Sequence, residues 1–186
     1  MTLKKLEEKE LFLIYRRYVL KFFPEAVLKA EDHVRYLYLR RRYTGYGLYE
    51  GGRLLAFGLF ITRPDAQELL LDYFVVLKKY RGKGYAEQFF REMKQLPDVA
   101  GVFLELPVDS EAGSFLRGIG IYPTGLVSEL APTKAKIWYE PVRVSPDAEV
   151  LPVKLGRLYE VVVPGFKEKR ELVHRWDAEP ESGERA

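Results

Sequence analysis

The stretch LLLDYFVVLKKYRGKGYAEQFF, residues 69–90, predicts a buried strand, a short basic glycine loop and a helix in direct succession. Residues 69–77 are apolar, β-branched or aromatic apart from Asp72, and a basic turn bounds them, as is typical of a buried strand. Beyond the loop, apolar residues recur at the spacing of one helix face: Phe89, Phe90, Met93 and Leu96. We expect the rest of the chain to be organised around this unit.

The loop between the strand and the helix is suited to hold a diphosphate. Gly82 and Gly84 lack the side chains that would keep a ligand away from the backbone, and they tolerate unusual φ and ψ values. The first turn of the following helix leaves its N–H groups without partners, and the helix dipole adds partial positive charge there. These features together predict a cradle for pyrophosphate.

This stretch resembles motif A of the GNAT family of acyl-CoA-dependent N-acyltransferases, which reads Arg/Gln-x-x-Gly-x-Gly/Ala after a hydrophobic strand. Arg81, Gly84 and Ala86 match the motif position for position, in the expected strand–loop–helix setting. The resemblance implies an α/β fold with a mixed, mostly antiparallel sheet, splayed central strands and flanking helices. Small stand-alone bacterial members with two N-terminal helices and a helical tail are the most similar. The alternative is an ordinary strand-to-helix turn, rich in Lys, Arg and Gly for solubility.

The order of the remaining elements agrees with this resemblance over roughly residues 7–142. Amphipathic spacing and hairpin signals predict, in order, helices at 7–23 and 26–42, strands at 43–50, 53–62 and 69–77, the glycine-loop helix, a strand at 101–106, a short helix at 110–117 and a strand at 135–142. The resemblance implies that the strands at 69–77 and 101–106 splay apart, so that the gap between them admits the pantetheine arm of coenzyme A.

From Ser145 onward the character of the chain changes. Ser145-Pro146-Asp147 is a helix-start signal, and two further helices are predicted at 151–162 and 167–176. We therefore expect three parts: a GNAT-like domain at 1–143, a C-terminal helical extension packed on it at 144–176, and a frayed polar tail at 177–186.

Composition narrows the class of protein. The 186 residues suit one domain, or one domain with a small appendage, and the 47% of hydrophobic residues can form a real core. The net charge of +3, from 30 basic and 27 acidic residues, argues against a nucleic-acid partner. There is no cysteine and there are two histidines, which argues against a metal site. No apolar run has the length of a membrane span, so we expect a cytoplasmic protein with no membrane partner.

The resemblance implies acetyl-CoA as co-substrate, no metal, and direct acetyl transfer to a primary amine of a small molecule or peptide. The oxyanion would be met by a backbone N–H near Val76 or Leu77, at the end of the splayed strand. An amide-bearing ligand can also satisfy the unpaired strand edges by adding itself as an extra strand. Cofactor binding is assigned, mostly through backbone groups, to Arg81, Gly82, Lys83, Gly84, Tyr85 and Ala86.

A base is useful because an amine with a pKa near ~10 is almost fully protonated at neutral pH. Glu105, inside an otherwise apolar strand, is the first candidate, since many GNAT members place a carboxylate on the matching strand. Asp72 is the second. A buried carboxylate without a partner carries a raised pKa, which suits a base. Both residues also have structural interpretations: Glu105 faces solvent by strand alternation, and Asp72 pairs with an arginine such as Arg53.

The general acid departs from the family pattern. GNAT members often carry a Phe-Tyr-x-x-x-Gly-Phe-like segment after the strand at 101–106, and its tyrosine protonates the leaving thiolate. The corresponding run, residues 115–121, reads FLRGIGI, with Leu116 in the place of the tyrosine. Tyr122 is the nearest substitute, and a core tyrosine is its alternative interpretation. A thiol with a pKa near ~8.5 is already a fair leaving group, so loss of the acid slows the reaction without preventing it.

Two other functions therefore stay open. A catalytically weak or inactive acyl-CoA-binding or sensing protein is favoured by Leu116. A nucleic-acid-associated module would use the arginines at 40–42 and exposed tyrosines, although a solvated helix terminus explains those arginines more simply. The aromatic strand at 43–49 could line a pocket or a dimer face, which leaves a homodimer open.

Overall fold

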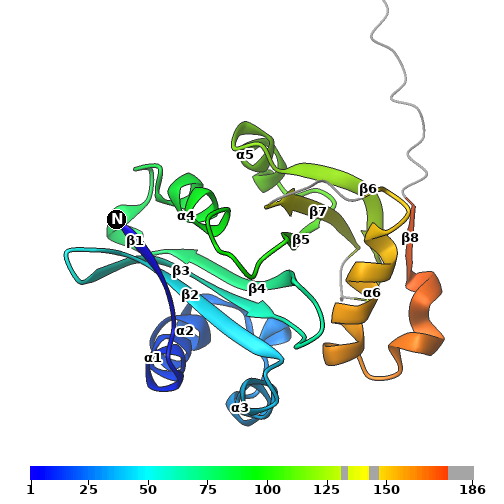
Figure 1. Cartoon of the computed structure of the whole chain (residues 1–186), viewed down its shortest axis with the longest axis horizontal. Coiled ribbons are helices and arrows are strands. Elements are labelled where there is room, and N and C mark those ends of the chain that lie inside the picture. The colour runs from blue at the N-terminus through cyan, green and yellow to red at the C-terminus, as the bar shows by residue number, and fades with distance from the viewer. Residues whose placement is uncertain (131–133, 143–146, 176–186) are drawn as a thin grey trace, which may run out of the picture.

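The computed structural model describes residues 1–130, 134–142 and 147–175, which form one eight-stranded sheet with helices on both faces (Figure 1). In sheet order, the strands are β1 (Thr2–Lys5), β2 (Tyr43–Glu50), β3 (Arg53–Ile61), β4 (Glu68–Val76), β5 (Gly101–Pro107), β7 (Ala135–Pro141), β6 (Tyr122–Ser128) and β8 (Val173–Arg175). Every neighbouring pair is antiparallel except β4 and β5, which are parallel. The predicted mixed, mostly antiparallel sheet is confirmed.

The helical segments cover the two faces of the sheet. They are α1 (Glu8–Ile14), the π-helical η1 (Tyr15–Val19), α2 (Leu20–Phe22), the 3₁₀ turn η2 (Glu25–Val27), α3 (Glu31–Leu39), the 3₁₀ turn η3 (Lys78–Tyr80), α4 (Tyr85–Met93), α5 (Ala112–Gly118), α6 (Leu151–Val162) and the 3₁₀ segment η4 (Phe166–Leu172). Figure 1 shows α4 and α5 above the sheet and α1–α3 below it. We call these sides the α4 face and the α6 face, because α6 packs in the lower layer.

Each face has its own apolar layer. The layer on the α6 face joins helix residues such as Leu11, Val34 and Leu155 to inward-pointing strand residues such as Phe103. The layer on the α4 face contains Phe89, Phe90 and Met93 of α4 and Leu116 of α5. Alternation along the strands explains the two layers, because successive side chains of a strand point to opposite faces.

β4 and β5 pair over only three residues each, Glu68–Leu70 with Gly101–Phe103. Beyond that point β4 stays paired with β3 as far as Val76, and β5 stays paired with β7 as far as Pro107. The register of β3 and β4 slips at this place, since Leu59 faces Tyr73 and Phe60 faces Leu71. Asp72 is thus the extra residue of a β-bulge, which bends the strand and increases its twist. The expected splay of the two central strands is confirmed.

The N-terminal half of the chain follows most of the sequence prediction. The hairpin turn at Gly51 and Gly52 has φ values of +54° and +75°, as a two-residue turn of this type requires. The helix predicted at 7–23 is continuous, although its middle, η1, is π-helical. The helix predicted at 26–42 is wrong at its start, because α3 begins only at Glu31.

Tertiary hydrogen bonds explain the late start of α3. The Tyr15 hydroxyl donates to the Lys29 carbonyl, and the Lys29 N–H donates to the Tyr73 hydroxyl oxygen over 3.1 Å. The Tyr73 hydroxyl in turn donates to the Val27 carbonyl over 2.8 Å. The backbone groups that a helix would use instead form hydrogen bonds with two tyrosines from other elements. These tertiary hydrogen bonds outweigh the local helix propensity.

The C-terminal extension differs from its prediction in one part. α6 forms at the predicted place. The helix predicted at 167–176 is wrong in its second part: residues 167–172 lie in the 3₁₀ segment η4, but residues 173–175 form β8, which pairs with β6. Trp176 and the predicted tail at 177–186 lie outside the described residues. Ser145 and Pro146 of the predicted helix start lie outside the described residues. The sequence interpretation also missed β1 and β6. In β6, Gly125 has a φ of +76° at an irregular register, which interrupts the alternation that identifies a strand.

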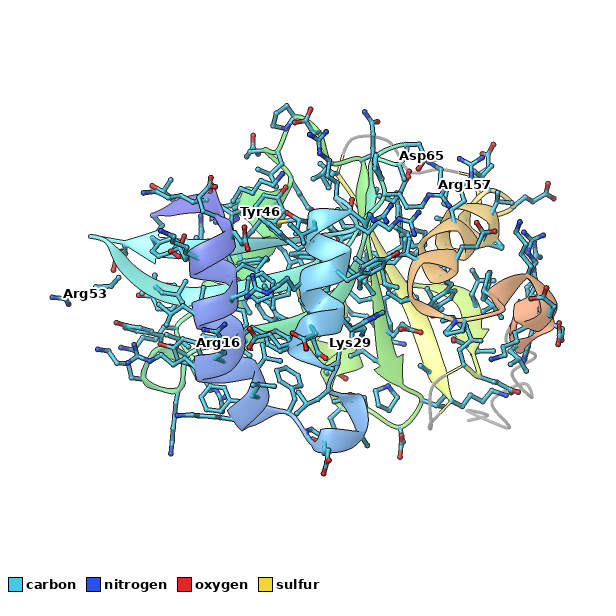
Figure 2. All side chains as sticks on the ribbon, turned by 90° about the horizontal axis from the view of Figure 1, so that it is seen from below. Arg16, Lys29, Tyr46, Arg53, Asp65 and Arg157 are labelled. Atoms are coloured by element: carbon cyan, nitrogen blue, oxygen red, sulfur yellow. The ribbon has the colours of Figure 1, made fainter. Side chains whose placement is uncertain are left out.

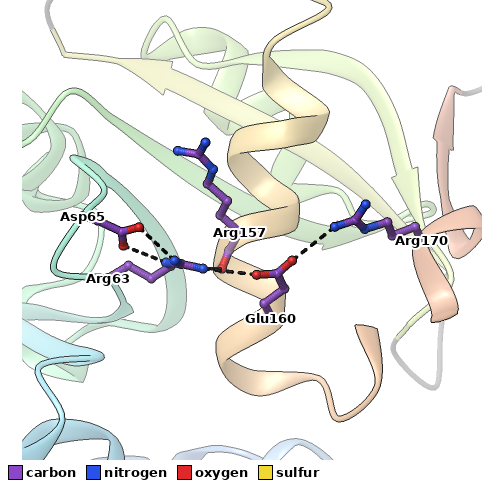
Figure 3. A network of polar contacts seen from close by, with 5 residues as sticks. All are labelled: Arg63, Asp65, Arg157, Glu160 and Arg170. Carbon is purple, nitrogen blue, oxygen red and sulfur yellow. Dashed lines mark hydrogen bonds and ion pairs between the residues drawn. The ribbon is translucent and has the colours of Figure 1, made fainter. Parts of the chain in front are cut away.

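Ion pairs attach α6 to the turn between β3 and β4. Arg63 donates to both oxygens of Asp65 over 2.8 Å and contacts Glu160 of α6 at 3.2 Å, and Glu160 also pairs with Arg170 (Figure 3). Lys154 of α6 forms an ion pair with the buried Glu68 at the start of β4. No helix of the described ranges has both the length and the apolar character needed to cross a membrane.

Gly101 should not tolerate a side chain. A Cβ placed on Gly101 would lie 2.0 Å from the Tyr139 hydroxyl oxygen, so Tyr139 would have to move within the packed core. We expect Gly101→Ala to lower the free energy of unfolding by about 1–3 kcal/mol, measured by urea denaturation. Gly118→Ala is the matched control, because a Cβ there meets nothing within 4 Å. Equal effects of the two substitutions would contradict this account of the β4–β5 junction.

Candidate functional site

The glycine loop after β4 presents bare backbone on its open side. Gly82 and Gly84 have φ values of +72° and +77°, and a Cβ on either would meet nothing within 4 Å. Gly84 is the N-cap of α4 and supplies no side-chain cap. Among the described residues, no backbone carbonyl accepts a hydrogen bond from the N–H groups of residues 82–87. The loop therefore has the donors and the space that an anionic group requires.

Arg81 attaches this loop to the end of β4. Its Nε donates to the Val76 carbonyl over 3.1 Å. The Leu77 N–H is already used, because it donates to the Leu55 carbonyl over 2.9 Å. This bond makes Val76 and Ala56 a non-hydrogen-bonded pair, so the Val76 N–H and C=O point away from β3. Of the two predicted oxyanion donors, Val76 thus has its N–H directed to the side of the splay.

A pocket of about 180 Å³ lies on the α6 face, where β4 and β5 separate. Asp72 of β4 and Glu105 of β5, the two predicted base candidates, both line it, and we call it the carboxylate pocket. Its other lining residues are Lys29, Ile61, Leu70, Leu71, Leu130, Tyr159, Val162 and Val163. A larger hollow of about 560 Å³ between the β3–β4 turn and α6 contains none of the predicted site residues.

Asp72 is held by two partners. The Lys29 Nζ lies 2.5 Å from its Oδ1, and the Tyr43 hydroxyl donates to its Oδ2 over 2.7 Å. Only 8% of the Asp72 side chain is exposed, so both contacts form largely out of water. The bulge in β4 directs the carboxylate to this position. The partner is therefore Lys29 and not Arg53. Figure 2 shows Arg53 at the edge of the molecule, well away from Lys29.

Glu105 has no partner of opposite charge in direct contact among the described residues. It accepts a hydrogen bond from the Tyr159 hydroxyl of α6. Burial raises the pKa of the Glu105 carboxyl, against smaller opposing effects from the hydroxyls of Tyr159 and Ser128 and from the charge of Lys29. The pKa of Tyr159 is raised well above its usual value by its own burial and then by the neighbouring carboxylate. Glu105 is thus half-buried and lines the carboxylate pocket.

Tyr122 is not brought together with these residues. It begins β6, opposite Tyr139 of β7, and 62% of its surface is exposed. Leu116, in the place of the family's tyrosine, is buried in the apolar layer of the α4 face. Among the described residues, no group of three or more metal-ligating side chains is present.

Three further residues at the site escaped the sequence interpretation: Lys29 and Tyr159, which line the pocket, and Tyr43, which donates to Asp72. Tyr159 occurs in the apolar pattern of α6, where a tyrosine is most simply a core residue. Lys29 lay inside a predicted helix, although the chain there is held extended between η2 and α3. No local signal identifies them, because each contacts Asp72 or Glu105 from an element distant in sequence.

Several solved structures have a similar fold. The ribosomal-protein-S18-alanine N-acetyltransferase from Escherichia coli is 20% identical, with a TM-score of 0.54 over 78% of this chain and 96% of that one. A putative GNAT-family acetyltransferase from Bacteroides thetaiotaomicron is 10% identical, with a TM-score of 0.67 over 87% and 98%. The spermidine N-acetyltransferase from Vibrio cholerae in complex with CoA and spermine is 16% identical, with a TM-score of 0.54 over 75% and 94%.

A comparison of the sequence with family profiles identifies the family. No curated protein matches the chain. A profile of the acetyltransferase (GNAT) family, in contrast, matches residues 10–106, which is more than half of the 186 residues. The matched region includes the bulged strand β4, the glycine loop and α4, and it ends within β5. With this match and the splayed sheet that carries the loop, the chain belongs to the GNAT acetyltransferase family.

Proposed function

We propose that this protein transfers the acetyl group of acetyl-CoA to a primary amine by direct attack. The observation that carries the proposal is the position of the splay between two chemically different surfaces. The glycine loop with its unpaired N–H groups precedes α4 on one face. The carboxylate pocket lies at the same splay on the α6 face. A thioester held from the first side would meet an amine that enters from the second.

The cofactor would be held mainly by backbone. The N–H groups of residues 82–86 would bind the diphosphate, and the amides of the pantetheine arm would pair with the free edge of β4 as an added strand does. The Val76 N–H is directed to this edge, where it would stabilise the oxyanion of the tetrahedral intermediate. That a spermidine acetyltransferase of the same fold binds CoA supports this assignment.

Glu105 is the proposed base. The amine must lose a proton before its lone pair can attack the thioester carbonyl carbon. Glu105 would take that proton directly or through water, and its raised pKa brings it closer to the working range of a base near neutral pH. The C–N bond then forms and the C–S bond breaks. Asp72 is less suited to this role, because Lys29 and Tyr43 already hold its two oxygens.

The sulfur leaves as the thiolate of coenzyme A. Neither Leu116, which cannot donate a proton, nor the exposed Tyr122 lines the pocket. In this proposal the thiolate takes its proton from water, which a leaving group with a pKa near ~8.5 permits. The same observation favours the second candidate, an acyl-CoA-binding protein with little or no transferase activity.

An acceptor panel separates the two candidates. Protein and acetyl-CoA are incubated with spermidine, with a peptide that begins with alanine, and with simple primary amines, while release of the thiol is followed. We expect release above the amine-free rate with at least one acceptor. Saturable binding of acetyl-CoA without any transfer would support the second candidate, and no binding at all would overturn both.

Gly84→Ala should weaken acetyl-CoA binding. A Cβ at a φ of +77° strains the N-cap of α4 and covers the donors of the loop. We expect a Kd at least about tenfold higher by calorimetry, which corresponds to about 1.4 kcal/mol. The matched control is Gly52→Ala in the hairpin, where the φ is +75° and the space is equally open. Similar losses of affinity in both variants would contradict the assignment of the loop.

Glu105→Gln should lower kcat and raise stability at alkaline pH. Loss of a general base costs about 100-fold or more in rate. Because the folded-state pKa of Glu105 is raised, its contribution to stability is fully present below the ordinary glutamate range and is lost as the pH rises through the folded-state pKa. The glutamine variant lacks this loss. We therefore measure the Tm of the variant minus the Tm of the native protein, and we expect this difference to be larger at pH 8 than at pH 5.

Glu140→Gln is the control for this substitution. Glu140 is also buried with a raised pKa, but it pairs with Lys94 and does not line the carboxylate pocket. The Glu140→Gln variant should therefore transfer acetyl groups at the rate of the native protein. If Glu105→Gln transferred acetyl groups as fast as the native protein, Glu105 would not be the base.

A further inference from the structure

Lys29 places a primary amine of the protein itself inside the carboxylate pocket. Its Nζ lies 2.5 Å from Asp72, and it lines the same pocket as Glu105. Only 24% of its side chain is exposed. A lysine with a purely solubilising role would extend into water, whereas this one reaches back toward the point where β4 and β5 separate.

The backbone of Lys29 is fixed as well. Its carbonyl accepts from the Tyr15 hydroxyl and its N–H donates to the Tyr73 hydroxyl oxygen. Tyr73 directly follows the bulge residue Asp72 in β4, so the same strand that carries the carboxylate also holds the lysine main chain. The side chain therefore extends from a held anchor into the pocket, and this limits the positions that its amine can take.

We propose that Lys29 is an internal acceptor, to which the protein transfers an acetyl group from its own bound acetyl-CoA. The inference rests on the proposed function, because it uses the same thioester and the same opening between the strands. The Lys29 ammonium first gives one proton to a carboxylate of the pocket or through water to solvent. Its nitrogen then attacks the thioester carbonyl carbon, the C–S bond breaks, and coenzyme A leaves as a thiolate that takes up a proton.

The modification would change the acceptor site. An acetylated Lys29 carries a neutral amide, so the ion pair with Asp72 would be lost and the Tyr43 hydroxyl would be its remaining described partner. The carboxylate would then be available to a cationic amine from outside. Self-acetylation would thus convert a pocket whose Asp72 is already paired into one that attracts a positively charged acceptor.

The direct test is peptide mapping by mass spectrometry after the full-length protein has been incubated with acetyl-CoA and no added amine. We expect acetylation at Lys29 to exceed that at the exposed Lys21 and Lys167 by at least about tenfold, because a positioned nucleophile reacts far faster than a free one. The modified fraction per unit time should not change when the protein is diluted, since the transfer is intramolecular.

Two variants complete the test. Arg81→Glu introduces a negative charge into the cradle, so Lys29 should then react no faster than the surface lysines. Lys29→Arg retains a cation for Asp72 but should show no acetyl group on the peptide that contains position 29. The inference is overturned if Lys29 in the native protein reacts only like Lys21, if Arg81→Glu leaves its acetylation unchanged, or if the rate rises with protein concentration.

These failures are distinguishable from failure of the proposed function. If the protein transfers acetyl groups to an added amine while Lys29 stays unmodified, the inference falls and the proposed function stands. If acetyl-CoA does not bind to the native protein, as calorimetry would show, both fall together.

Discussion

The hydrogen bonds between β4 and β5 end after Leu70 and Phe103, and the rest of the site depends on that break. A sheet that continued to pair would leave no free edge on β4, because each buried N–H and C=O normally finds a partner. The bulge at Asp72 turns β4 away while β3 keeps its other edge paired as far as Val76. One extra residue therefore produces the opening, the direction of the Asp72 carboxylate and the unpaired edge that a ligand can use.

The two carboxylates of the pocket are held in different environments. Asp72 has a lysine ammonium and a tyrosine hydroxyl against its oxygens, and so it keeps its charge paired. Glu105 has hydroxyl neighbours and a distant lysine, so desolvation dominates and its pKa rises. In the proposed mechanism, this division would leave Glu105 to exchange protons while Asp72 stays bound to Lys29 and Tyr43. The same pocket also holds the amine of Lys29.

The sequence allowed the central unit to be predicted because its signals are local. The apolar run of β4, the glycines at 82 and 84 and the helical spacing of Phe89, Phe90 and Met93 all lie within a short stretch. The partners of the site could not be predicted in the same way. Lys29 reaches the pocket because two tyrosines from α1–η1 and β4 hold its backbone, and no pattern near residue 29 encodes those contacts. β8 was missed because three residues are too few for an alternation to be recognised.

The hydrogen bond between Tyr159 and Glu105 has a consequence for the biosynthesis of the protein. The family profile ends at residue 106, yet one wall of the pocket comes from α6, more than forty positions later. A chain that emerges from the ribosome in order can pair β2, β3 and β4 long before α6 is available. The nascent protein therefore has its glycine loop first and the α6 wall of the carboxylate pocket last, so the pocket stays incomplete until translation has passed Val162.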